Sequence, residues 1–215
     1  HPARVLTLLI SAPPLSCARP VCEVISPPPN SIVSVPCVCR YATLGEKARY
    51  CYSVCLNPNA PQWRALFEGI DNSFFPGPDV RAHEELPRDK ALEDIAGHER
   101  EGLCHSVWTF GTPFIGGICN CDRADCLAMR ATLGHEMPMM FRAEYVAEID
   151  PGSCGGCREC VRVCPFGALE WSVSSGKASV DRRHCWGCGV CRSVCPTEAI
   201  RLLDRSRVPV AAGVW

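Results

Sequence analysis

Two runs of cysteines near the C-terminus carry the clearest chemistry in this 215-residue sequence. Each run has the spacing Cys-x2-Cys-x2-Cys-x3-Cys-Pro. Four thiolates can hold the corners of a [4Fe–4S] cube, and the two-residue spacing lets one tight loop present three of them while its backbone N–H groups point at the sulfides. A pair of four-cysteine zinc knuckles is the alternative, but zinc sites seldom use four consecutive thiols at this spacing. The pattern therefore predicts two [4Fe–4S] clusters, held by Cys154, Cys157, Cys160, Cys164, Cys185, Cys188, Cys191 and Cys195.

Residues 143–205 resemble the two-[4Fe–4S] bacterial ferredoxins, whose runs also end in Cys-Pro, as they do here at Pro165 and Pro196. The resemblance implies a pseudo-twofold α+β fold and crossed ligands, because in this family the cysteine before proline binds the other cluster. Cluster one would then take Cys154, Cys157, Cys160 and Cys195. Cluster two would take Cys185, Cys188, Cys191 and Cys164. The crossing ties the two halves together, so neither half should fold alone without its clusters.

Short elements must position these loops. We expect a first strand over 145–149, a helical turn over 161–165, and a hairpin made of 168–173 and 178–180. The aromatic residues beside the runs are interpreted as packing that excludes water from the clusters; they are Phe166, Trp171 and Trp186.

Seven further cysteines form three packets in the first two thirds of the chain, namely Cys37 with Cys39, Cys51 with Cys55, and Cys119 with Cys121 and Cys126. Each packet lies at the end of an expected element, and soft thiolates select iron–sulfur clusters or zinc. A third [4Fe–4S] cluster or a zinc ion is therefore predicted, with Cys39, Cys51, Cys55 and Cys121 as preferred ligands and Cys37, Cys119 and Cys126 as alternates. Seven independent buried thiols are the other interpretation.

The elements expected around these packets are a strand over 32–35, which leads to the first packet, and a turn into a helix over 45–52. That helix would carry Cys51 and Cys55 one turn apart on the same face.

A helix over 88–101 has an apolar stripe with acidic residues opposite, and Gly102 is a natural stop. It leads into a hairpin of 103–110 and 114–118, whose far end carries the third packet. We therefore expect an α+β protein in which a small cysteine-rich domain, with a helix–hairpin element similar to a winged helix, precedes the ferredoxin domain.

Residues 31–205 as a whole resemble a group of larger cysteine-rich 4Fe–4S ferredoxin-like proteins of anaerobes, through Cys-x-Cys-Arg40, the Cys-x3-Cys pair and the Cys-Asn-Cys motif. Proteins of this group often carry an extra cysteine where this chain has Asp125. The resemblance implies electron transfer, a function that the two predicted clusters already indicate by themselves.

Composition and Pro content divide the chain into four expected parts: a Pro-rich arm over 1–30 that includes Cys17 and Cys22, a cysteine-rich front domain over 31–141, the ferredoxin domain over 142–205 and an apolar tail over 206–215. The apolar run 5–10 is interpreted as a strand rather than a signal-peptide core, since it is short. No run of 18 apolar residues occurs, and a cluster-bearing chain favours a reducing compartment, so a cytoplasmic location is expected.

The first functional hypothesis is an electron-transfer subunit or dedicated partner of a redox enzyme, within a hetero-oligomeric complex. The net charge of −1 gives no reason to expect a nucleic acid as a binding partner. Residues 142–215 carry ten basic and eight acidic side chains, whereas 81–141 carry six and ten, so an acidic docking face would lie on the front domain. The apolar tail would be covered by a partner subunit or by the front domain.

The sequence leaves two other functions open. An enzyme with its substrate at a front cluster could use His105 or His135 as acid or base, but the dinucleotide, phosphate-loop, His-Glu-x-x-His and radical-SAM motifs do not occur. A redox-sensing regulator would need a basic recognition helix, and the helix over 88–101 is acidic. His184 beside Cys185 is interpreted as tuning a cluster's potential through hydrogen bonding.

Overall fold

The computed structural model describes residues 7–10, 31–45, 47–55, 57, 59, 61, 65, 77–79, 82–108 and 116–214. The expected Pro-rich arm with Cys17 and Cys22 lies outside these residues, apart from 7–10. The strands are β1 Thr7–Ile10, β2 Ile32–Val35, β3 Cys51–Val54, β4 Glu84–Glu85, β5 Cys104–Trp108, β6 Gly117–Cys121, β7 Tyr145–Ile149, β8 Leu169–Ser172, β9 Lys177–Val180 and β10 Ile200–Asp204. The helices are α2 Val38–Leu44, α4 Arg88–Arg100, α5 Leu127–Gly134, α6 Glu159–Val163, α7 Val190–Ser193 and the 3-10 turn Arg205–Arg207.

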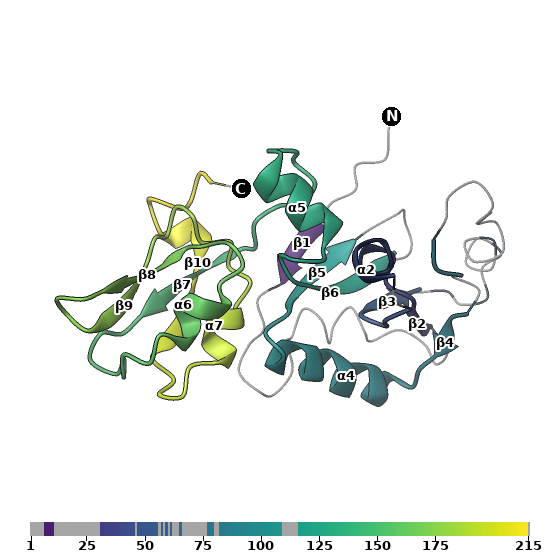
Figure 1. The fold of residues 1–215 in the computed structure, drawn as a ribbon, viewed down its shortest axis with the longest axis horizontal. Helices are drawn as coiled ribbons and strands as arrows, with labels where there is room; N and C mark the ends of the chain where they lie inside the picture. Colours follow the sequence, from purple (N-terminus) through teal and green to yellow (C-terminus); the bar gives the residue numbers. More distant parts are fainter. Residues whose placement is uncertain are drawn as a thin grey trace.

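The elements up to α5, called here the front part, are built on one antiparallel sheet with the strand order β1-β5-β6-β3-β2-β4. Helix α4 runs along one side of this sheet (Figure 1) and buries Ala91 and Ile95 against Ile32, Val54 and Ile118, among others. This helix was predicted from its apolar stripe, and the prediction is confirmed.

The antiparallel pair expected after α4 is present, since β5 and β6 pair from Cys104↔Cys121 to Trp108↔Gly117. The second strand lies later than the expected 114–118, so Cys119 and Cys121 are part of it rather than beyond its end. Both strands pair on their other side as well, β5 with β1 and β6 with β3. They are therefore interior strands of a sheet rather than a free wing. The apolar run near the N-terminus forms strand β1, as expected.

The helix expected over 45–52 is wrong. Cys51–Val54 is strand β3, which is paired on one side with β2 and on the other with β6. The helix of this region is instead α2, which begins after Cys37 and ends at Gly45 with a φ of 70°. Pairing on both sides satisfies the backbone groups of β3, and Tyr52 and Val54 suit a strand buried in a sheet.

The elements from β7 onward are called here the C-terminal part. They form two short antiparallel sheets, β10-β7 and β8-β9. Along the chain, α6 lies between β7 and β8, and α7 lies between β9 and β10. Figure 1 shows them gathered beside the front sheet. Strand β7 spans the residues predicted for it, and the predicted hairpin is present as β8 and β9. The buried core of this part includes Val146, Leu169 and Ile200 together with the cysteines Cys160, Cys185 and Cys191.

The apolar tail packs within the C-terminal part, because Val208 and Ala211 belong to the same core. Arg205 is fully buried and donates hydrogen bonds to the carbonyls of Ala143, Tyr145 and Cys185, at 2.7–2.9 Å. Val208 and Ala211 are thus covered by the C-terminal part itself, where the buried guanidinium holds the chain after β10 against β7. Val210 is 49% exposed, so the expectation that a partner covers the tail stays a prediction.

Among the described residues, the structure contains no helix with the length and apolar character needed to cross a membrane.

Candidate metal centres

The first cavity of the C-terminal part lies between the loop before α6 and the segment after α7. Four cysteines line it, together with small and apolar residues such as Gly156, Ala178 and Ile200. Three of these cysteines come from the first run and one from the end of the second run: Cys154, Cys157, Cys160 and Cys195. The chain path therefore gathers thiols from both runs around one space.

The second cavity repeats the arrangement with the runs exchanged. Its cysteines are Cys185, Cys188 and Cys191 from the second run and Cys164 from the end of the first. Burial raises the pKa of Cys185, Cys188 and Cys191 above that of an ordinary thiol. Thiolates at these positions therefore need a cation beside them, which is what a bound metal supplies.

Backbone amides point at two of these sulfurs. The Ala147 N–H donates to Cys185 Sγ at 3.3 Å, and the Ala168 N–H donates to Cys164 Sγ at 3.4 Å. Soft thiol donors, apolar walls and N–H groups directed at sulfur are the surroundings that iron–sulfur clusters require. The second cavity has all three features, and the first shares the thiols and the apolar walls, so the residues of both fit a [4Fe–4S] cluster.

The backbone of the two runs repeats its left-handed positions. Positive φ angles occur at Gly156, Arg158 and Gly167, and they recur after the interval that separates the two runs, at Gly187, Gly189 and Glu198. Gly187 has a second constraint, because a Cβ added there would lie 2.1 Å from the Tyr145 carbonyl oxygen. The loop before Cys188 can therefore lie against β7 only because residue 187 has no side chain.

We expect Gly187→Ala to lower the free energy of unfolding of the cluster-loaded protein by about 3 kcal/mol or more, since a clash with backbone adds to the strain of φ +76°. The matched control is Gly167→Ala, which has φ +67° but nothing within 4 Å of the added Cβ, so its loss should be about 1 kcal/mol. Thermal unfolding of both variants measures this difference, and equal losses would contradict the close approach to Tyr145.

Aromatic side chains cover the second cavity. Phe166 and Trp186, which both line it, stack with their ring centroids 4.8 Å apart and their planes 8° from parallel. This agrees with the packing role expected for them. His184 lies on the surface, where its Nδ1 is 2.7 Å from Asp181 Oδ2, so its ring is held by a carboxylate.

The three cysteine packets of the front part meet at one end of the front sheet, with one exception. Cys51 and Cys119 are opposite one another on β3 and β6, and Cys37 caps α2 just after β2. Cys55 lies at the other end of β3, where its backbone N–H bonds to the Ser31 carbonyl and its Sγ donates to the Asn57 carbonyl at 3.1 Å. The structure therefore brings together six of the seven predicted cysteines and leaves out Cys55, one of the preferred four.

Cys104 is an eighth cysteine of this region that the sequence analysis missed. It is fully buried and directly opposite Cys121 in the β5–β6 pair. It belongs to no cysteine packet, so only the strand register could have revealed it. Burial raises its pKa, and the neighbouring Cys188 and Cys121 add to the effect.

One buried cluster connects the front cysteines with the second cavity. It contains Cys104, Cys121, Cys126, Met129 and Val190, among others, and Phe166, Trp186 and Cys188 pack against it. Within the described residues, the cluster includes none of the side chains that line the first cavity. The front cysteines therefore lie closer to the second cavity's wall than to the first cavity.

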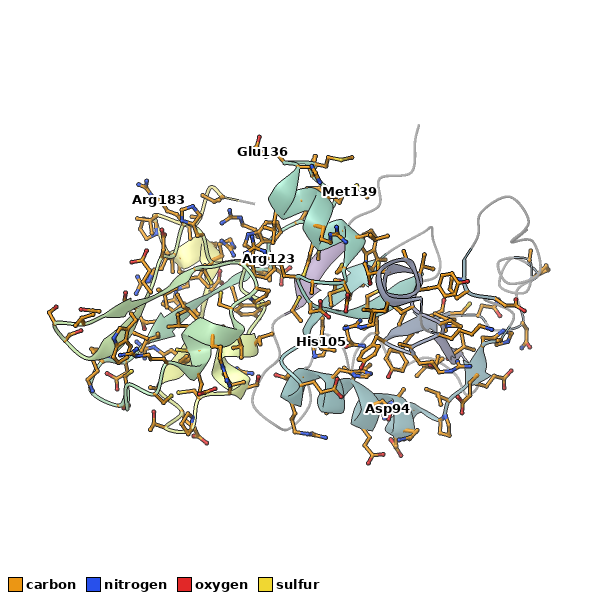
Figure 2. All side chains as sticks on the ribbon, in the orientation of Figure 1. Asp94, His105, Arg123, Glu136, Met139 and Arg183 are labelled. Atoms are coloured by element: carbon orange, nitrogen blue, oxygen red, sulfur yellow. The ribbon has the colours of Figure 1, made fainter. Side chains whose placement is uncertain are left out.

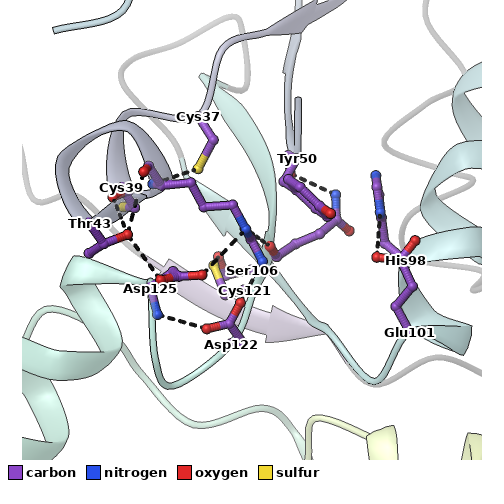
Figure 3. Close-up of polar contacts among 12 residues, drawn as sticks. Cys37, Cys39, Thr43, Tyr50, His98, Glu101, Ser106, Cys121, Asp122 and Asp125 are labelled. Atoms are coloured by element: carbon purple, nitrogen blue, oxygen red, sulfur yellow. Dashed lines mark hydrogen bonds and ion pairs between the residues drawn. The ribbon is translucent and has the colours of Figure 1, made fainter. Parts of the chain in front are cut away.

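Arg40 joins the first and third packets. Its guanidinium, 7% exposed, makes an ion pair with Asp122 at 2.5 Å, donates to the Asn120 carbonyl at 3.2 Å, and lies 3.7 Å from the centre of the Tyr50 ring. Its backbone N–H donates to Cys37 Sγ at 3.5 Å. Figure 3 shows Cys37, Cys39 and Cys121 around the network that includes Asp122.

We expect Arg40→Ala to lower the free energy of unfolding by about 3–5 kcal/mol, because it leaves the Asp122 carboxylate without its buried partner. The control is Arg123→Ala, next to Asp122. Because its side chain is exposed, this substitution should change the free energy of unfolding by no more than about 0.5 kcal/mol. Chemical denaturation of both variants provides the comparison; similar stabilities for the two would mean that Arg40 does not hold the packets together.

The histidines proposed as acid or base occupy different surroundings. His105 is buried, its Nδ1 lies 2.7 Å from Asn120 Oδ1, and burial lowers its pKa to about 4. Figure 2 shows it inside the front part, away from the surface where Glu136 and Arg183 lie. His135 is exposed after α5. His105 is thus a neutral core histidine bonded to Asn120 rather than a proton donor facing a substrate.

Among the described residues, no three His, Cys, Asp or Glu side chains are placed to hold one single metal ion. The cysteines around the two C-terminal cavities are likewise too far apart to bind one ion together. That spacing is compatible with a four-iron cube, because its ligands are farther apart than those of a single ion.

Comparison with known proteins adds one match. Residues 153–199 fit the family model of the 4Fe–4S dicluster domain. A search of curated proteins finds no match to the chain. The segment that contains both cysteine runs is therefore a ferredoxin-like 4Fe–4S domain.

Proposed function

We propose that this protein transfers electrons through two [4Fe–4S] clusters held by a ferredoxin domain that spans residues 142–205. The 4Fe–4S dicluster match supports the cofactor and an electron-transfer function. The observation that carries the proposal is the composition of the two cavities, since each is lined by three cysteines of one run and the last cysteine of the other. The proposed ligands are Cys154, Cys157, Cys160 and Cys195 for cluster one and Cys185, Cys188, Cys191 and Cys164 for cluster two.

The recurrence of left-handed backbone positions in the two runs supports the pseudo-twofold fold of the bacterial ferredoxins, as does the pairing of β7 with β10 and of β8 with β9. The residues before 142 would then be an N-terminal arm over 1–30 and a cysteine-rich domain over 31–141, and the tail over 206–215 would complete the ferredoxin domain.

A bound [4Fe–4S] cluster takes up and releases one electron at a time without a change of covalent bonds in the substrate. The chain's own contribution is to supply thiolates, to aim amides such as those of Ala147 and Ala168 at sulfur, and to exclude water with Phe166 and Trp186. Each of these shifts a cluster's potential.

A redox enzyme or another carrier is the proposed partner, in a hetero-oligomeric complex. The C-terminal residues 142–215 carry more basic than acidic side chains, and the acidic excess lies in 81–141. Helix α4 presents acidic residues of that excess on its exposed face, which would suit a partner with a basic docking surface.

Anaerobic reductive titration of the whole chain tests the proposed function. Each bound cluster should take up one electron, at least two per chain, and return them to a one-electron acceptor, with loss and recovery of the visible absorbance. A protein that contains iron and sulfide but takes up no electrons would contradict the proposal.

A further inference from the structure

Six cysteines of the front part have side chains that lie within interaction range of one another. Cys37 has Cys39 and Cys51 as such neighbours. Cys126 has Cys39 and Cys121. The pairs Cys37–Cys51 and Cys39–Cys126 each join two different packets, so the packets approach one another through their sulfurs.

The remaining contacts close this chain of thiols. Cys119 has Cys121 as a neighbour on one side and Cys51, directly opposite it across the strand pair, on the other. Every thiol of the set thus has two thiol neighbours, and we call the set the thiol ring: Cys37, Cys39, Cys126, Cys121, Cys119 and Cys51. Cys55 is outside the ring, as its position at the far end of β3 requires.

The fold, rather than local sequence, makes the ring. Strand β3 brings Cys51 opposite Cys119 of β6, and α2 brings Cys39 to the start of α5, which follows Cys126. Six thiols held by two strands and two helix starts are more than the four that either a structural zinc ion or a [4Fe–4S] cluster takes. Any such centre would therefore have four ligands here and two further sulfur neighbours.

Positive charge and hydrogen-bond donors surround the ring. Arg40 is buried beside Cys37, and Ser106 Oγ lies 3.6 Å from Cys121 Sγ. An iron–sulfur cluster with four thiolates carries net negative charge and accepts hydrogen bonds at its sulfurs, so a buried guanidinium and a hydroxyl suit it. Asp122 and Asp125, the sequence neighbours of Cys121 and Cys126, form ion pairs with Arg40 and hold it there, with its Nε 3.8 Å from Asp125 Oδ2.

We propose that the thiol ring binds a third iron–sulfur cluster, with its four ligands drawn from the six ring cysteines and with Cys39 and Cys121 among the four. This site lies outside the dicluster domain and goes beyond the function proposed for it. The shared buried cluster of Cys104, Cys121 and Cys188 places the third centre next to the second cavity, where protein packing rather than water separates the two.

Iron, acid-labile sulfide and zinc should be counted in the whole chain after anaerobic purification, for the wild type and three variants. Cys121→Ala removes a buried thiol of the ring, and Cys39→Ala removes one that is only half-buried, so its replacement disturbs the fold less. Cys55→Ala is the matched control, because this cysteine is buried in the same sheet but is not in the ring.

The wild type and Cys55→Ala should each contain about twelve iron atoms, and both ring variants about eight, with the reduced-state EPR signal of one cluster missing. About eight iron atoms in all four proteins would overturn the third cluster and leave the C-terminal assignment intact. One zinc ion that is lost in both ring variants would overturn the choice of an iron–sulfur cluster. About four iron atoms in the wild type, lost in the ring variants, would support the ring and contradict the two C-terminal clusters.

Discussion

Replacing Cys164 by Ala is expected to remove the cluster of the second run rather than that of its own run. Cys164 lies at the end of the first run, yet it lines the second cavity with Cys185, Cys188 and Cys191. A cubane that loses one of four thiolates is exposed to water and is readily lost, so about four iron atoms per chain should disappear. Iron analysis of the anaerobically purified variant gives this number.

Pairs of substitutions identify which cluster is lost. Adding Cys188→Ala to Cys164→Ala should cost no further iron, because both cysteines line the second cavity. Adding Cys157→Ala should cost about four more, because Cys157 lines the first cavity. The reverse pattern, with Cys157 redundant and Cys188 additive, would show that each run binds its own cluster.

Removal of the clusters is expected to unfold the C-terminal part. Its helices span only five and four residues, its strands only four or five, and three members of its buried core are cysteines that line the cavities. Helices this short have little stability of their own, so metal binding supplies much of the folding free energy. Treatment with a chelator and an oxidant should therefore bring backbone amides of β7 to β10 into rapid hydrogen exchange.

The front sheet provides the internal control for that experiment. The core beneath α4 contains Ile32, Val54, Ile95 and Ile118 but no cysteine among its buried members. Amides of β2 and β5 should accordingly stay protected longer than those of β7 when the metal is removed. Protection that is lost equally in both parts, or retained in both, would contradict a C-terminal part that depends on its clusters.

The C-terminal elements were predictable from the sequence because the cysteine spacing restricts the loops so closely. With Cys154, Cys157 and Cys160 around one centre, the resemblance to two-cluster ferredoxins implies a strand before the run and a hairpin after it, and both were found where expected. The buried role of Arg205 was not predictable, since nothing in its local sequence shows that it will reach the carbonyls of Ala143 and Tyr145.

The front packets show where sequence reasoning fails. Cys51 and Cys55, four residues apart, share a face in a helix and also in a strand, so their spacing does not tell the two apart. The distance between them does differ, at about 6 Å along a helix and about 13 Å along a strand. Because the segment is strand β3, Cys55 cannot join Cys51 in one site, and the alternates Cys37, Cys119 and Cys126 are the ones that meet it or its neighbours.

Cys104 and Arg40 depend in the same way on long-range structure. The register of β5 against β6 puts Cys104 opposite Cys121, and the turn after β6 brings Asp122 to Arg40, which is far from it in the sequence. Local patterns indicate that cysteine packets lie at the ends of elements, but the sheet order decides which packets meet.

Anomalous diffraction at the iron absorption edge, from crystals grown without oxygen, tests the central claim most directly. Two strong iron peaks are predicted in the C-terminal part, one among Cys154, Cys157, Cys160 and Cys195 and the other among Cys164, Cys185, Cys188 and Cys191. Peaks that appear only at the zinc edge, or iron bound by the four cysteines of a single run, would contradict it.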